Sequence, residues 1–206
     1  MAKLKAPLLS LGASGKLGDA LVFFAWKGLD VVRTYVIPAN PNTTLQQTQR
    51  NYLKAAVAKI HGAQSATDVA WSAVDQAAYS LLGSTYATPR TWFNTIVKQW
   101  LNQKKAGKIP NVWRAATITP GVLKATVRCY QFSESSEITT VNIRYGVSKT
   151  NLSSVSSGLS KATLEAGAEI TGLTAGLKYY FQIQPTLPTT FLDTNSGIFH
   201  ATPTAA

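Results

Sequence analysis

The chain has 206 residues, of which 45% are hydrophobic and 10% aromatic, enough to bury the core of one large or two small domains. Only 14% of the residues are charged, yet the formal net charge is +11, and no run approaches the ~20 apolar residues that a membrane-spanning helix needs. A single cysteine, Cys129, excludes an intrachain disulfide and a multi-cysteine metal site.

The chain opens with a predicted β-hairpin. Residues 1–18 are expected to form an extended arm and turn, whose glycines lack the spacing of a phosphate-binding loop. Residues 21–24 and 31–37 are rich in β-branched and aromatic side chains, which suit a pleated sheet. Lys27 and Gly28 lie between these two runs and can turn the chain, so we predict that the runs pair as a hairpin.

Three amphipathic helices are predicted to follow. Pro38 and Pro41 end the second strand because proline has no N–H to donate to a strand ladder. Apolar side chains then recur at helical spacing over residues 43–61, 67–82 and 89–105. The expected caps and ends are Thr43 or Thr44 at the start of the first helix, Gly62 at its end, Ser65 or Thr67 at the start of the second, with Asp68 in its first turn, and Thr88 at the start of the third.

The tryptophans of this half are expected to share a core rather than to form a ligand cage. Each of them lies on an apolar run or stripe, and aromatic side chains in that setting are usually buried. They are Trp26, Trp71, Trp92 and Trp100. Residues 111–116 are the predicted linker to a second domain, where Trp113 is expected to pack the two domains together.

From Thr117 onward the apolar pattern changes to alternation. Short alternating runs separated by Ser, Gly and Asn are typical of strands in a β-sandwich. The predicted strands are 122–130, 138–145, 152–155, 162–164, 179–184 and 198–201. Cys129 lies within the first of these strands and is expected to act as a small buried hydrophobic residue.

The run AEITGLTAGLKYYFQIQP, residues 168–185, resembles the fibronectin type III domain. In that family a leucine precedes a turn, and a tyrosine heads the next strand and bonds back to the turn; Leu173 and Tyr179 match these positions. The resemblance covers residues 117–206. This chain departs from the family at the family's second strand. The family usually has a tryptophan there, and this chain has Val127 to Tyr130.

The first half carries a second resemblance. The runs SGKLGDALVFFAWKGLDVVR and PANPNTTLQQTQR, with Trp71 and Trp92-Phe93-Asn94, resemble a family of small proteins found in tailed-phage and prophage genomes. Members of that family are mostly uncharacterised. The resemblance therefore implies a virion context rather than an activity, and it carries over no functional residue.

These patterns together predict an α+β protein. A β-hairpin and three-helix anchoring module is expected over residues 1–110, a linker over 111–116 and an all-β, fibronectin type III-like sandwich over 117–206. The only histidines, His61 and His200, are far apart in sequence, and the nine carboxylates show no metal-ligand pattern. We therefore expect no enzyme activity, no cofactor and no metal.

The expected function is that of a virion structural protein: a capsid decoration protein or a head- or tail-associated subunit. We expect it to be made in the bacterial host cytoplasm, to be oligomeric and to contact other capsid or tail subunits. The exposed edge of the hairpin offers a surface for strand addition. The candidate assembly contacts are Trp26, Lys27, Arg33 and Arg50.

Two alternatives remain open at the level of sequence. Residues 1–114 hold 14 Lys or Arg against 4 Asp or Glu, whereas residues 115–206 hold 6 against 5. A basic half of this kind is compatible with a nucleic-acid-associated protein, although no recognition helix crowded with arginine is evident. The second alternative is a host-surface or glycan-binding module formed by the loops of the sandwich.

Overall fold

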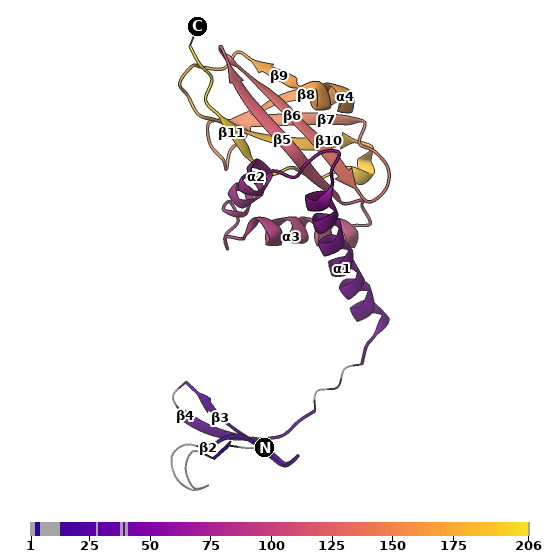
Figure 1. Ribbon diagram of the computed structural model, residues 1–206, viewed down its shortest axis with the longest axis vertical. Coiled ribbons are helices and arrows are strands. Elements are labelled where there is room, and N and C mark those ends of the chain that lie inside the picture. Colours follow the sequence, from indigo (N-terminus) through magenta and orange to yellow (C-terminus); the bar gives the residue numbers. More distant parts are fainter. Residues whose placement is uncertain (1–2, 5–12, 28, 38, 40, 206) are drawn as a thin grey trace. The chain divides into compact units, whose positions relative to one another are not determined.

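The computed structural model describes residues 3–4, 13–27, 29–37, 39 and 41–205 (Figure 1). The chain divides into two compact units, Met1–Thr43 and Thr44–Ala206. The described residues form four α-helices and three antiparallel sheets, so the protein is α+β, as predicted. Most of the arm predicted at residues 1–18 lies outside the described residues.

The first unit is an antiparallel sheet with the strand order β1-β2-β3-β4. Its strands are β1 (Lys3–Leu4), β2 (Ala13–Leu17), β3 (Leu21–Trp26) and β4 (Leu29–Thr34). The predicted hairpin is confirmed, because β3 and β4 pair from Leu21–Thr34 to Trp26–Leu29. Lys27, in the connection, has a φ of 49°, the left-handed conformation that tight hairpin turns require. Strand β2, formed by the glycine-spaced segment, was not predicted.

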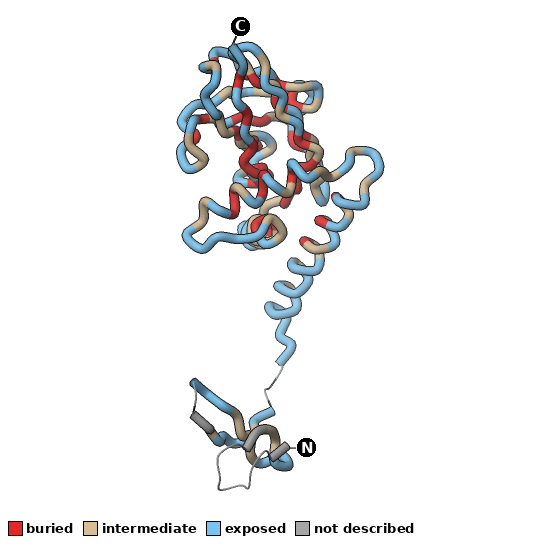
Figure 2. Tube along the Cα trace, turned by 60° about the vertical axis from the view of Figure 1, so that its left-hand side comes forward, coloured by how far each residue is buried: buried red, intermediate tan, exposed pale blue. Residues whose placement is uncertain are grey.

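Three helices begin the second unit: α1 (Thr44–Ser65), α2 (Ala73–Gly83) and α3 (Trp92–Lys105). All three were predicted, but their ends differ from the prediction. Helix α1 continues through Gly62, which is therefore not a helix end. The N-terminal turns of α1 are exposed, and its buried residues lie in the second half (Figure 2).

The residues that cap α2 and α3 lie later in the sequence than predicted. The Ser72 hydroxyl accepts a hydrogen bond from the Asp75 N–H at 3.2 Å, and the Asp75 carboxylate accepts one from the Ser72 N–H at 2.8 Å. This reciprocal capping box starts α2 at Ala73, so Asp68 lies before the helix and not in its first turn. Thr91, rather than Thr88, caps α3.

Two further sheets form the rest of the second unit. One has the order β5-β6-β9 and the other β11-β10-β7-β8. Their strands are β5 (Asn111–Gly121), β6 (Lys124–Ser133), β7 (Thr140–Gly146), β8 (Ser154–Ser160), β9 (Ala168–Thr171), β10 (Tyr179–Leu187) and β11 (Phe199–Ala201). Buried side chains of both sheets, Cys129 and Phe181 among them, belong to one core cluster. The predicted burial of Cys129 is confirmed, and burial raises the pKa of its thiol.

Two predictions in this region are wrong. The linker expected at 111–116 is the first half of β5, where Val112 and Trp113 are buried. The strand expected at 162–164 lies in the short helix α4 (Lys161–Ala166), because the Ser160 hydroxyl caps that helix by accepting from the Thr163 N–H. A 3-10 turn (η1, Thr189–Phe191) follows β10.

The helices and the two sheets share one core, which corrects the predicted boundary between residues 110 and 117. The ring N–H of Trp113 donates to the Thr194 carbonyl at 2.7 Å, and its backbone N–H donates to the Tyr79 hydroxyl of α2 at 3.0 Å. Trp113 thus joins the helices to the sheets, as expected. Of the four tryptophans expected in a shared core, Trp71, Trp92 and Trp100 pack there. Trp26 does not: it belongs to the other unit and is 59% exposed.

A buried carboxylate fixes α2 to β5. Asp75 is fully buried, and its two oxygens accept from the backbone N–H groups of Ala115 and Ala116, each at 2.9 Å. The register of β5 against β6 shifts between Arg114 and Thr117, so these N–H groups lie at an irregularity in the ladder. The carboxylate supplies the acceptors that the ladder lacks there.

Candidate interaction surfaces

In the sheet of the first unit, none of the side chains whose burial is described, those of residues 15–17, 21–26 and 31–34, is buried. A sheet normally covers at least one face with another layer, because apolar side chains exposed to water are unfavourable. Here Trp26 is 59% exposed, Val32 49% and Leu17 43%. The sheet therefore presents apolar surface of the kind that partners cover.

The strand register assigns the side chains of this sheet to two chemically different faces. Lys16, Val22 and Arg33 are aligned across β2, β3 and β4, and Phe24 and Trp26 follow on the same side of β3 because side chains alternate along a strand. We call these five residues the basic-aromatic face. The Arg33 guanidinium lies 5.2 Å from the centroid of the Phe24 ring, a cation–π geometry. The charge and the aromatic surface are therefore adjacent.

The opposite face carries no Lys or Arg among the paired residues of β2, β3 and β4 that the structure describes. Leu17 pairs with Leu21, and Phe23 pairs with Val32, so these four apolar side chains share one side of β2, β3 and β4. Leu21 and Phe23 are half-buried, whereas Leu17 and Val32 are exposed. The sheet thus offers one apolar side and one aromatic side that carries Arg33 and Lys16, the latter paired with Asp19.

Three of the four candidate contacts lie on the hairpin. Trp26 and Arg33 belong to the basic-aromatic face, and the Lys27 ammonium lies 6.0 Å from the centroid of the Trp26 ring. Arg50 is exposed on α1, in the other compact unit. The structure therefore places Trp26, Lys27 and Arg33 on one hairpin, with Lys27 beside Trp26, and it places Arg50 on a different element.

Three basic residues at or after the end of α3 are partnered by carboxylates. Lys104 pairs with Glu134, Lys108 with Asp193 at 2.6 Å, and the buried Arg114 with Asp68 at 3.0 Å. The Arg114 guanidinium holds the pKa of the Asp68 carboxyl below its usual value. Of these three basic residues only Lys104 lies on a helix, so the ion pairs bear little on the nucleic-acid alternative.

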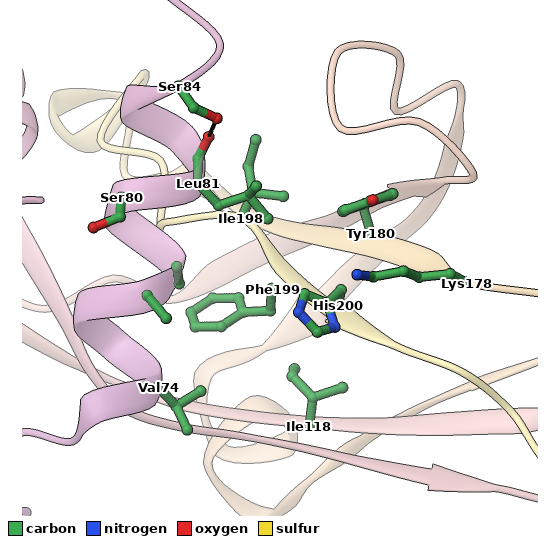
Figure 3. Close-up of a pocket in the computed structure, with 12 residues that line it drawn as sticks. Val74, Ser80, Leu81, Ser84, Ile118, Lys178, Tyr180, Ile198, Phe199 and His200 are labelled. Atoms are coloured by element: carbon green, nitrogen blue, oxygen red, sulfur yellow. Dashed lines mark hydrogen bonds between the residues drawn. The ribbon is translucent and has the colours of Figure 1, made fainter. Parts of the chain in front are cut away.

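A second surface is the groove between α2 and the β10–β11 edge, with a volume of about 690 Å³ (Figure 3). Its walls are mainly apolar. They are formed by Val74, Ala77, Ala78 and Leu81 of α2, Ile118 of β5, and Ile198 and Phe199 at the start of β11. The sequence did not indicate this groove, because its walls come from segments that were assigned to separate domains.

Polar side chains occupy one end of the groove. Lys178 precedes β10, and Tyr180 of β10 pairs directly with His200 of β11. The Tyr180 and His200 rings meet edge to face with centroids 6.3 Å apart, and the Lys178 ammonium lies 5.5 Å from the Tyr180 centroid. Burial and the nearby Lys178 charge lower the pKa of His200, so its imidazole is neutral near pH 7.

No group of three or more His, Cys, Asp or Glu side chains that could hold a metal ion occurs in the described part of the chain. None of the described helices combines the length and the apolar character of a membrane span. No family model, curated protein or solved structure matches this chain. The functional interpretation therefore depends on the two surfaces themselves.

Proposed function

We propose that this protein is a non-enzymatic structural subunit of a bacteriophage virion and acts through protein–protein contacts. The observation that carries the proposal is the sheet of the first unit, where no described side chain is buried. Short strands with apolar faces need a covering layer for stability. We assign that layer to other subunits of the particle. The tailed-phage resemblance of residues 14–33 falls on this same sheet, which supports a virion as the context.

The basic-aromatic face is the proposed contact with another virion protein. Trp26 and Arg33 are both exposed, and tryptophan and arginine are the residue types that contribute most often to interface energy. The positive charge favours a partner surface rich in Asp and Glu. We place the assembly contact on the hairpin, at Trp26, Lys27 and Arg33.

We also propose that the sandwich of the second unit is fibronectin type III-like. Its three- and four-stranded antiparallel sheets suit such a sandwich. The Tyr179 hydroxyl accepts a hydrogen bond from the Thr174 N–H at 3.2 Å, and Leu173 before this turn is buried. This is the back-bond that the sequence resemblance implies. The structure departs from the family in the position of the buried tryptophan. The family usually has it on the second strand, whereas here it is Trp113 of β5.

The experiment is quantitative mass spectrometry of purified virions from the phage that encodes this chain. The protein is expected at a fixed copy number in the particles. A Trp26→Ser/Arg33→Glu variant should be depleted from them by tenfold or more, since it removes the proposed interface residues. The matched control is Lys105→Glu, which makes the same charge change at an exposed site on α3.

Absence of the wild-type protein from washed particles would contradict the proposal. Equal incorporation of the hairpin variant and the control would instead overturn the assignment of the contact to Trp26 and Arg33. Light scattering of the purified protein gives a second readout. It should show an oligomer, or a complex with a coat or tail subunit, rather than a strict monomer.

A further inference from the structure

The apolar wall that α2 contributes to the groove is an uncovered helix face. Val74, Ala77 and Leu81 are spaced so that they share one side of the helix, and Val74 is 49% exposed. Ile118 lies opposite, and the Phe199 ring points from β11 toward the helix (Figure 3). A volume of about 690 Å³ is within the range of sites that hold small molecules.

The polar end of the groove offers three hydrogen-bond donors. They are the Lys178 ammonium, the Tyr180 hydroxyl and the imidazole N–H of His200. Lys178 has no carboxylate partner within the described residues, and Tyr180 makes no side-chain hydrogen bond there. Lys178, just before β10, and Tyr180 of β10 therefore present unused donors to the groove beside His200 of β11.

The charge of the groove selects for an anion. None of the residues that line it is Asp or Glu. At the other end, Ser84 also lines the groove, and its hydroxyl accepts a hydrogen bond from the Lys149 ammonium at 3.0 Å. Cations near both ends, with no carboxylate in the lining, favour a negatively charged ligand.

We propose that this groove binds a small amphiphile made of an aliphatic chain and a terminal carboxylate, with the carboxylate at Lys178, Tyr180 and His200 and the chain along α2. One ammonium and two neutral donors match a monoanionic head group. The aliphatic chain covers Val74 and Leu81, which gains the free energy of burying apolar surface. The site is separate from the hairpin contacts and does not depend on them.

The test is calorimetric titration of the full-length protein with decanoate below its micelle concentration. We expect saturable binding at one site. Decanol has the same chain without the charge. Its affinity should be lower than that of decanoate by about tenfold or more, because it loses the charge-assisted hydrogen bonds. Decylammonium should not bind measurably. Lack of saturable decanoate binding, or equal affinity for decanol, overturns the proposal.

Two variants separate the head group from the chain. Lys178→Gln, at an exposed side chain, should weaken decanoate about tenfold and leave decanol unchanged. Ala77→Trp should fill the groove and abolish binding of both. The matched control is Lys105→Gln, which removes one charge from α3 outside the groove. Equal weakening by Lys105→Gln and Lys178→Gln would show nonspecific attraction and would overturn the site.

Discussion

Asp75 shows how one side chain can decide the architecture of the second unit. Its carboxylate closes the capping box with Ser72 and accepts the N–H groups of Ala115 and Ala116. A carboxylate has only acceptors, so it suits a position where every surrounding group is a donor. Because Asp75 is fully buried, no water can take over these bonds when they are broken.

We expect Asp75→Asn to destabilise the protein by about 2–4 kcal/mol, because the amide turns an N–H₂ group toward backbone donors and leaves them unsatisfied. Urea unfolding followed by circular dichroism measures the change. Ser72→Ala is the comparison: it removes the helix cap and one donor to the Asp75 carboxylate, keeps the bonds from Ala115 and Ala116, and should cost about 1 kcal/mol. A loss below about 0.5 kcal/mol for Asp75→Asn would show that the buried carboxylate does not hold α2 to β5.

The sequence supported some of these residue assignments and not others. Cys129 was predicted to be buried, because alternation along one strand is local information. The role of Asp75 was missed because its partners, Ala115 and Ala116, lie 40 and 41 residues later in the chain and belong to a predicted linker. Trp26 was placed in a core because an apolar run looks the same whether this chain or a partner covers it.

At the scale of elements, α2 and the segment before β11 approach so closely that only glycine fits between them. A Cβ on Gly197 would lie 2.5 Å from the Ala78 carbonyl carbon and 2.7 Å from the Tyr79 nitrogen. The neighbouring Ile198 N–H donates to the Ala78 carbonyl at 3.0 Å. This contact sets the position of α2 beside the β10–β11 edge and so forms the groove.

Gly197→Ala should therefore destabilise the protein by about 1–3 kcal/mol, because backbone atoms on both sides must move. Gly62→Ala is the matched substitution in α1. A Cβ there would meet only the Phe132 ring, at 3.5 Å, and alanine is the better helix former, so stability should rise by about 0.5–1 kcal/mol. Thermal unfolding compares the two variants. Equal effects of the same sign would contradict the assigned contact.

Element types were easier to predict than element ends. The three helices follow from periodicity, and the β3–β4 hairpin follows from two β-branched and aromatic runs around Lys27-Gly28, all of which a single sequence displays. The cap residues of the helices could not be predicted in this way, because residues 65–91 contain several Ser and Thr that could each start a helix. Strand β5 was missed because its first residues, 111–116, are buried on both faces, and their apolar side chains therefore do not alternate with exposed polar ones.

For the whole molecule, the division falls at residue 43 and not near residue 110. Composition separated a helical half from a strand-rich half, and that contrast was read as a domain boundary. The hydrogen bonds of Asp75 and Trp113 and the close approach of Gly197 show why it is not one: α2 contributes to the same core as β5 and β11.

A chain that begins at Thr44 should fold without the first unit and unfold in one cooperative transition. Residues 111–206 alone should not reach a native fold, because they lack Tyr79 and Asp75 and expose the β5 surface that α2 covers. Calorimetry and amide NMR dispersion of the two fragments provide the measurement. A folded 111–206 fragment with a sharp transition would restore the two-domain division at residue 110.

The bonds between Asp75 and β5 also limit how this gene can be reshuffled. A crossover that joined the coding region for residues 111–206 to a foreign leader would leave the N–H groups of Ala115 and Ala116 without their acceptor. A crossover at residue 43 would break none of these hydrogen bonds, because Asp75, Ala115 and Ala116 all lie within residues 44–206. Exchange between lineages should therefore transfer residues 44–206 as one inherited block, while the segment before them is free to be replaced.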